Sequence, residues 1–371
     1  MAIDEDLVAQ PAMLVLARES RGWTQVDVAE QMSKLDQPNR ISQGYVSRAE
    51  AGRLAVKGDR LDLFATALRY TPQMLCATTD MQGVGIGLVH HRKRASMGVA
   101  DLRRIHATLA FTRHQTDALT RAVADSGKHR FRHIAVSDLD TPQDAADTIR
   151  EEWDVPTGPV TDLTRLIEEA GALVVVRDLQ TTELDAVSQW PPGGPPLFLL
   201  NSTAPGDRFR FSLAHELGHV LMHTQPGDPR EQEQEADYFA AQFLMPYGSI
   251  RQDLKQGVDL PRLLELKARW GVSMAALIRR AFSLNIIKEW QYRKLMVEMS
   301  ALGYRTNEPG LVPRETPHHL AQVVTRLERE HHLDPIQAAH LAGLDHEEFH
   351  EIYLCASSSS GNPMVLGQPV R

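Results

Sequence analysis

The sequence predicts a helix-dominated α+β protein with more than one domain. Apolar residues recur at helical spacing along most of the chain, whereas segments typical of strands, the first of them an apolar β-branched run, cluster at residues 172–176, 185–190 and 197–201. At 371 residues, the chain is also too long for one ordinary hydrophobic core. We therefore expect a small sheet in the middle of the chain, with helical regions before and after it.

Breaks in these patterns divide the chain into four parts. A run from Gly83 to Arg94, first rich in Gly and then basic, is typical of a linker, and Pro309, Pro313 and Pro317 mark a second break. The expected parts are an all-α domain at residues 1–80, a linker with connecting helices at 81–150, an α+β domain at 151–302, and a helical segment at 303–371 that ends in a disordered tail.

The composition and net charge indicate a globular protein and limit how it could bind DNA. A hydrophobic content of 42% and a charged content of 24% are typical of globular proteins, and no apolar stretch is long enough to span a membrane. The N-terminus is acidic and does not resemble an export signal. The two cysteines lack metal-type spacing, so we expect a cytoplasmic protein without a disulfide. The net charge of -8 predicts that any DNA contact must come from a local patch.

The run His215-Glu216-Leu217-Gly218-His219 carries the clearest chemical signal. On a helix, His215 and His219 share a face and can direct both imidazoles to one metal ion, with Glu216 beside them. This is the H-E-x-x-H pattern of zinc peptidases, in which Glu216 would act as general base toward a water that the metal activates. His223, one turn further on, either hydrogen-bonds near the site or has a structural role.

The apolar residues around this motif predict a helix buried in a domain core. Two imidazoles and a carboxylate without partners would be costly there, and a bound metal ion removes that conflict. An ordinary core helix with hydrogen-bonded histidines is the alternative. A catalytic zinc ion also needs a third protein ligand and an open position, and a carboxylate of the acidic helix expected at residues 231–246 is the natural source.

The first 80 residues show the pattern of a compact helical domain. Helices are expected at residues 12–21, 24–32, 42–52 and 60–70, with Thr24 as the cap of the second helix. A helix, a connection and a second helix with polar side chains resemble the helix-turn-helix of phage-repressor DNA-binding domains.

That resemblance implies a DNA-binding surface on the third helix. The residues in the positions that face the major groove are Gln43, Tyr45, Ser47 and Arg48. The basic residues of the expected phosphate-contacting patch are Arg40, Arg48, Arg53 and Lys57, which against Glu50 give residues 40–57 a charge of +3, from four bases and one acid. The connection at residues 33–41 is longer than the usual turn. A helical interaction module without affinity for DNA is the alternative.

The peptidase motif and the sequence that follows it resemble one family. H-E-L-G-H-x-L-x-H at residues 215–223 and E-A-D-x-F-A-x-x-F-L-M-P at residues 235–246 are similar to the ImmA/IrrE family of bacterial metallopeptidases, which often carry an N-terminal repressor-type helix-turn-helix. The resemblance covers residues 153–284 for the peptidase part and 11–75 for the DNA-binding part. It implies a zincin-like fold, in which the metal helix lies on a small sheet whose edge holds extended substrate.

The same resemblance assigns residues to the site. It implies that Glu235 is the third zinc ligand and that Asp237 orients a ligand. Glu231 and Glu233 are the competing ligand candidates. Glu235 ranks ahead of them because Phe239, one turn later on its face, is apolar and should point inward.

The function implied is that of a regulatory zinc metalloendopeptidase. Its substrate would be a transcriptional repressor, cleaved to release stress-response or mobile-element genes, and double-stranded DNA would be a second partner. The main alternative is a DNA-binding regulator, antitoxin-like in one form, whose zinc site is structural or sensory. A helical adaptor without a metal is a third reading. Whether the chain forms a homodimer stays open.

Overall fold

The computed structural model describes residues 7–78, 89–91, 97–121, 123, 130–136, 141–225 and 227–354. The chain forms two compact units. Unit 1 consists of Met1–Thr79, His106–Ala124 and Thr316–Arg371, and unit 2 consists of Asp80–Ile105 and Asp125–Glu315. The helical segment expected at residues 303–371 is divided between them, because residues 303–315 belong to unit 2. Most of the expected linker from Gly83 to Arg94, and the expected disordered tail, lie outside the described residues.

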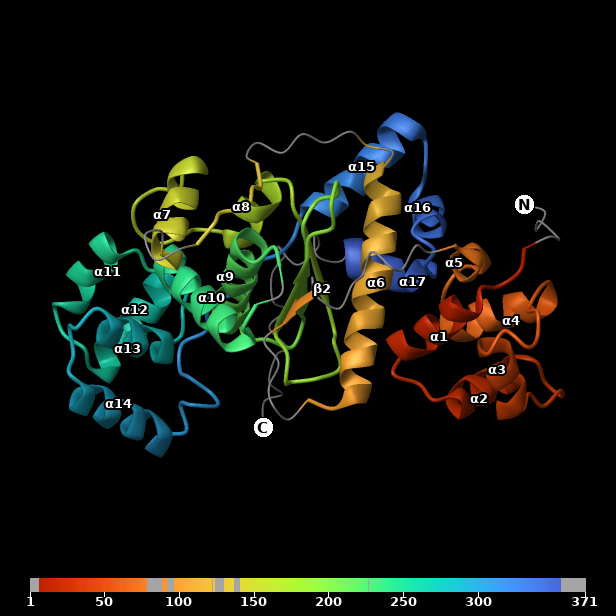
Figure 1. Cartoon of the computed structure of the whole chain (residues 1–371), viewed down its shortest axis with the longest axis horizontal. Helices are drawn as coiled ribbons and strands as arrows, with labels where there is room; N and C mark the ends of the chain where they lie inside the picture. The colour runs from red at the N-terminus through yellow and green to blue at the C-terminus, as the bar shows by residue number, and fades with distance from the viewer. Residues whose placement is uncertain are drawn as a thin grey trace, which may run out of the picture. The chain divides into compact units, whose positions relative to one another are not determined.

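The described part of unit 1 begins with five short helices (Figure 1). They are α1 (Pro11–Ser20), α2 (Gln25–Leu35), α3 (Gln43–Glu50), α4 (Asp59–Leu68) and α5 (Pro72–Cys76). Thr24 caps α2 through a capping box with Asp27, as the sequence predicts, and Ser42 caps α3. Glu50, the last residue of α3, forms an ion pair of 2.7 Å with Arg18 of α1. The caps fix where α2 and α3 begin, and the ion pair fixes how α3 packs against α1.

Helices from later in the chain complete unit 1. They are the part of α6 (Val99–Arg121) from His106 onward, α15 (His319–His331), α16 (Pro335–Leu341), α17 (His346–Phe349) and the π-helical turn η3 (His350–Leu354). The Tyr70 ring stacks on Phe111 of α6 with centroids 4.3 Å apart, and Arg21 donates to Glu348 at 2.8 Å. The C-terminal helices therefore pack against the N-terminal ones and share their core.

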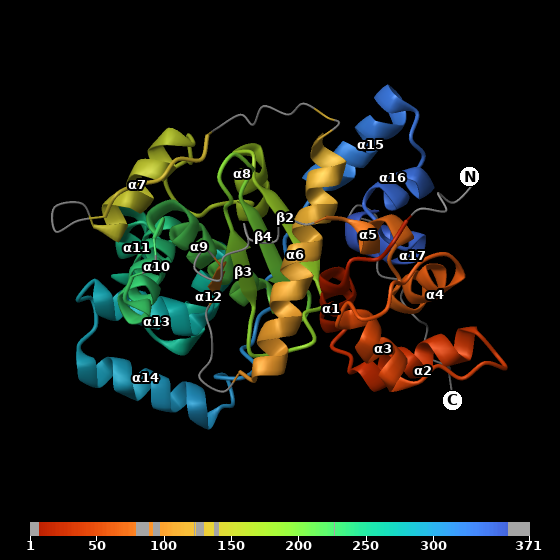
Figure 2. The same cartoon turned by 45° about the vertical axis from the view of Figure 1, so that its right-hand side comes forward.

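A four-stranded sheet is formed by the described residues of unit 2 (Figure 2). Its strands lie in the order β1 (Val89–His91), β3 (Ala186–Gln189), β4 (Leu197–Asn201) and β2 (Leu173–Arg177). β2 is parallel to β4, whereas β3 is antiparallel to both of its neighbours. The three longer strands are those that the sequence predicts, and β3 and β4 are buried throughout. β1 is not predicted, because its residues lie in the expected linker.

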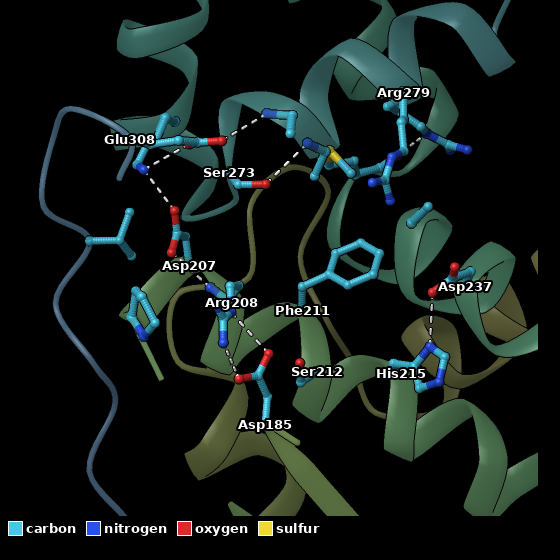
Figure 3. A pocket seen from close by; sticks show the side chains of 18 of the residues that line it. Asp185, Asp207, Arg208, Phe211, Ser212, His215, Asp237, Ser273, Arg279 and Glu308 are labelled. Carbon is cyan, nitrogen blue, oxygen red and sulfur yellow. Dashed lines mark hydrogen bonds and ion pairs between the residues drawn. The ribbon is translucent and has the colours of Figure 1, made fainter. Parts of the chain in front are cut away.

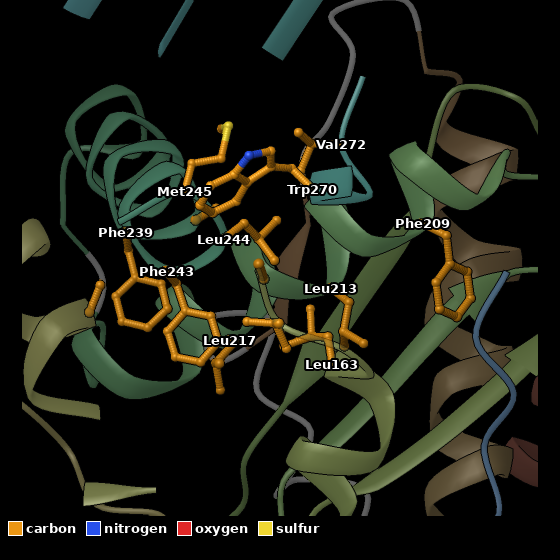
Figure 4. Close-up of a cluster of buried hydrophobic side chains, with 14 of the residues drawn as sticks. Leu163, Phe209, Leu213, Leu217, Phe239, Phe243, Leu244, Met245, Trp270 and Val272 are labelled. Carbon is orange, nitrogen blue, oxygen red and sulfur yellow. The ribbon is translucent and has the colours of Figure 1, made fainter. Parts of the chain in front are cut away.

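Eight helices in the described part of unit 2 form its core together with this sheet. They are α7 (Pro142–Glu152), α8 (Leu163–Glu169), α9 (Gly206–Met222), α10 (Pro229–Leu244), α11 (Tyr247–Leu254), α12 (Leu260–Trp270), α13 (Met274–Ser283) and α14 (Glu289–Ala301). α9 contacts β3 and β4 and also packs against α10. Large apolar side chains fill the space around α9, among them Leu217, Phe239, Phe243 and Trp270 (Figure 4). α9 is thus buried over most of its length, as its apolar surface predicts.

Residues 303–315, which we call the strap, follow α14 and pack against earlier segments of unit 2. A Cβ atom at Gly206, the first residue of α9, would overlap the carbonyl oxygen of Val312, so only glycine permits this close approach. Glu308 accepts a hydrogen bond of 2.9 Å from the buried ammonium group of Lys267 on α12. None of the helices in the described part of the chain has the length and apolar character that crossing a membrane requires.

Glu315, the last residue of the strap, attaches it to α8 and to Arg210 of α9. Its carboxylate accepts hydrogen bonds from the backbone N–H groups of Leu163 and Thr164, at 3.0 and 2.7 Å, and pairs with Arg210. Arg210 is only 4% exposed and also donates to the Val160 carbonyl at 2.7 Å. Burial lowers the pKa of this guanidinium to about 10. Glu315 therefore caps α8 and neutralises a buried charge at the same time.

Replacing Glu315 with Ala is expected to lower the free energy of unfolding of unit 2 by about 3–5 kcal/mol, because Arg210 keeps its buried charge and loses its partner. Urea denaturation followed by tryptophan fluorescence measures the change. The matched control is Glu289→Ala, which breaks an exposed pair with Arg293 on α14 and should cost at most about 1 kcal/mol. If both variants lose the same free energy of unfolding, the role given to Glu315 is contradicted.

Candidate metal centre

His215 and His219 lie one turn apart on α9 and face the same buried space. Their Nε2 atoms are 3.0 Å apart, and both side chains are almost fully buried. Glu233 of α10 reaches this space, with carboxylate oxygens 3.5 Å from His215 Nε2 and 3.3 Å from His219 Nε2. Within the described residues, these three side chains are the group whose ligand atoms all lie within 4.8 Å of one another.

The donor atoms of this group suit a divalent metal ion. His215 Nδ1 lies 2.9 Å from Asp237, and His219 Nδ1 lies 2.8 Å from His223. If both imidazoles are neutral and each Nδ1 carries the proton on its outer side, the two Nε2 lone pairs face each other and the Glu233 carboxylate. Three such electron-pair donors, converging in a buried space, can hold one cation between them. Two imidazoles and one carboxylate are also a ligand set that zinc takes in catalytic sites.

The expected third ligand, Glu235, lies elsewhere. Its carboxylate is 2.8 Å from His223 Nε2, beyond the space that His215 and His219 share. Glu233 and Asp237 are four residues apart on α10, so they share the face that meets the two histidines, whereas Glu235 points along a different direction. The geometry therefore favours Glu233 over Glu235 as the third ligand. It does not place Glu231, the other candidate, in this group.

A second layer of contacts holds both histidines in place. Asp237 bonds His215 directly, while His223 links His219 to the Glu235 carboxylate. Burial opposes a charge on His215, but its hydrogen bonds to Asp237 and Glu233 outweigh that effect and raise its pKa to about 9. Contacts of this kind fix the tautomer and orientation of a ligating imidazole. Asp237 and His223 contact the two histidines, and their role in supporting metal ligands stays a prediction.

Glu216 lies next to this group and is 1% exposed. Its Oε2 accepts a hydrogen bond of 2.6 Å from Ser188 Oγ, in the middle of β3. Burial raises the pKa of the Glu216 carboxyl to about 8. No sequence motif marks Ser188. Only the packing of α9 on β3 reveals that its hydroxyl group fixes Glu216.

A cavity of about 1570 Å³ opens onto His215 and Glu216 (Figure 3). Its walls carry ion pairs between Arg208 and Asp185, and among Asp207, Lys267 and Glu308 of the strap. In Figure 3, His215 and Asp237 lie on one side of the cavity, and Asp207 and Glu308 lie on the other. The space is larger than most small-molecule pockets and can hold a segment of polypeptide.

Residues 167–282 match the model of the Peptidase M78 family, described as the IrrE N-terminal-like domain. This match indicates a metallopeptidase-like function. The matched segment, called the IrrE-like domain below, contains α9, α10, Ser188 on β3 and every member of the His/Glu cluster. A search of curated proteins gave no match to the chain.

Gly218 sets the distance between the two helices that carry the cluster of the IrrE-like domain. A Cβ atom at Gly218 would lie 3.1 Å from the Phe239 side chain of α10, closer than most packed carbon atoms. The small residue inside the H-E-L-G-H motif therefore lets α10 bring Glu233 up to the two histidines.

Gly218→Ala should destabilise the IrrE-like domain by about 1–3 kcal/mol, since the extra methyl group overpacks the contact with Phe239. It should also weaken zinc binding, because Glu233 moves with α10. Thermal unfolding with and without zinc measures both effects. Gly248→Ala on α11 is the control, because a Cβ atom there meets nothing within 4 Å. The explanation fails if Gly218→Ala is as stable as that control and binds zinc equally well.

The residues predicted to contact DNA lie on unit 1, on and around α3. The exposed members are Arg40, Gln43, Arg48, Arg53 and Lys57. Tyr45 and Ser47 are half-buried, and the Tyr45 ring stacks on Phe64 with centroids 6.2 Å apart. Gln43 donates to the Gln25 side chain at 2.7 Å, which joins the first turns of α2 and α3. DNA contact by these residues stays a prediction.

Proposed function

We propose that unit 2 is a zinc-dependent endopeptidase that cleaves a transcriptional repressor and that unit 1 binds double-stranded DNA. The observation that carries the proposal is the convergence of His215, His219 and Glu233. His215 also lines an open cavity, and so does Glu216. The match of residues 167–282 to a peptidase family supports the same chemistry. The proposals that the substrate is a repressor and that unit 1 binds DNA rest on the resemblance to regulatory metallopeptidases.

In the proposed mechanism, the metal ion and the side chains of the protein have separate roles. A zinc ion held by His215, His219 and Glu233 would supply a Lewis acid that polarises a peptide carbonyl and lowers the pKa of water. Glu216 takes the proton of the attacking water and returns it to the leaving amine. Ser188 fixes one carboxylate oxygen of Glu216 at 2.6 Å, so the proton carrier keeps one orientation during both transfers.

The surrounding residues keep the ligands aligned. Asp237 orients the His215 ring, and the pair of His223 and Glu235 orients the His219 ring through two consecutive contacts of 2.8 Å. Glu235 thus acts on the metal centre through His223 and is not itself a ligand in this proposal.

Unit 1 would direct the peptidase to its target. α3 is capped, packed against α1 and exposed at several polar and basic positions, which suits insertion into a major groove. Binding at an operator would bring the peptidase close to a repressor that occupies the same region. The net charge of -8 makes a local basic patch necessary for this role.

Co-expression with candidate repressors of the same organism tests the proposal. The wild type should produce a truncated form of one repressor, and Glu216→Gln should leave that repressor intact. The competing function is a DNA-binding regulator whose metal site is structural or sensory. Specific DNA binding that survives Glu216→Gln, with no truncated repressor in any co-expression, would favour that function and contradict ours.

A further inference from the structure

Strand β1 occupies the outer edge of β3. The backbone of Val89–His91 pairs antiparallel with β3, and His90 lies opposite Ser188. The other edge of β3 is paired with β4. Without β1, the outer edge of β3 would present a row of unpaired backbone N–H and C=O groups, which is a template for any extended chain.

This edge lies directly beside the candidate metal centre. Ser188, the partner of His90 in the strand register, donates its hydroxyl hydrogen to Glu216 at 2.6 Å. Helix α9, which carries His215 and His219, contacts both β1 and β3. A strand opposite Ser188 therefore runs past the proposed proton carrier. An extended chain paired with this edge would therefore have its backbone beside Glu216.

We infer that β1 occupies the substrate position, so that this segment of the chain competes with extended peptides at its own metal centre. Extended peptides bind sheet edges through main-chain hydrogen bonds, and β1 already makes this kind of pairing with β3. The inference rests on the proposed peptidase function for the nature of the substrate. The competition itself is a binding equilibrium and can be measured without cleavage.

The length of β1 makes this competition selective. A strand of three residues forms few hydrogen bonds, so as a free peptide it would bind weakly. Its attachment to the chain gives it an effective concentration on the order of mM. Short or weakly matched peptides are then excluded, whereas a substrate with a longer complementary strand displaces β1. Such an arrangement restricts the target range of the peptidase.

A labelled peptide with the sequence of residues 86–94 tests the inference. Its affinity is measured by fluorescence anisotropy on the zinc-loaded full chain with Glu216→Gln, so that nothing is cut. His90→Pro in that background removes a backbone donor from β1 and should increase the affinity for the peptide by about tenfold. His90→Ala keeps the backbone donor and should leave the affinity near its starting value.

Each outcome is decisive. Tighter binding caused by His90→Pro but not by His90→Ala supports competition by β1, even if the wild type cleaves no protein and the proposed function fails. Equal affinity in all three proteins, or no binding to any of them, overturns the inference. A second measurement uses the chain with only Glu216→Gln and an isotope-labelled peptide. Saturating peptide should accelerate amide hydrogen exchange at residues 89–91, and unchanged exchange would also overturn the inference.

Discussion

Substitution of Glu216 by Gln is expected to reduce peptide cleavage by about 10²- to 10⁴-fold while the protein keeps its zinc. Gln fills nearly the same volume and can still accept the hydrogen bond from Ser188, but it cannot take a proton. Glu216 is not among the three groups that converge on the proposed metal position, so the ion should remain bound.

The turnover rate on the cleaved repressor and the zinc content by elemental analysis are the two quantities to measure. Glu231→Gln is the matched control, because Glu231 is an exposed carboxylate on the first turn of α10. That variant should keep the wild-type rate. A Glu216→Gln protein that cleaves as fast as the control would exclude Glu216 as the proton carrier.

The second large effect is expected at Glu233. Glu233→Gln should weaken zinc binding by at least about 100-fold, because it removes the charge of a direct ligand. Glu235→Gln should weaken it by about tenfold or less, since Glu235 acts only through His223 and His219. The pair forms a matched comparison, because the same chemical change is made two residues apart on one helix.

Competition with a chromogenic zinc chelator gives both dissociation constants under identical conditions. Circular dichroism of each variant without zinc checks that α10 still folds. If Glu233 is the ligand, as the geometry indicates, Glu233→Gln should lose clearly more zinc affinity than Glu235→Gln. A larger loss of zinc affinity for Glu235→Gln would instead support Glu235 as the ligand, as the family resemblance implies. It would contradict the ligand assignment made from the orientation of α10.

Much of the metal helix and its sheet could be predicted from the sequence. The spacing of His215 and His219 requires one helical face, and the apolar residues between and around them require burial. The strands expected at residues 172–176, 185–190 and 197–201 are confirmed by the structure, and the first and third follow from their apolar runs.

The rotation of α10 could not be predicted in the same way. Phe239 does point inward, but it packs against Gly218 and not toward the metal position, so it does not bring Glu235 there. Which of two acids, Glu233 and Glu235, meets the histidines depends on how α9 and α10 dock. That docking is set by contacts far apart in the sequence.

Two other features depend on strand register. Ser188 is an unremarkable residue of a buried strand until β3 is placed beside α9, where its hydroxyl group meets Glu216. β1 has three residues within a stretch that is first rich in Gly and then basic, and it carries no strand pattern of its own. Only its pairing with the edge of β3 makes it a strand.

Anomalous X-ray scattering at the zinc absorption edge, from crystals of protein purified with zinc, tests the central claim most directly. The account predicts a strong peak at about 2.0–2.2 Å from His215 Nε2, His219 Nε2 and a carboxylate oxygen of Glu233. A peak coordinated by Glu235 and His223, or no peak between His215 and His219, would contradict it.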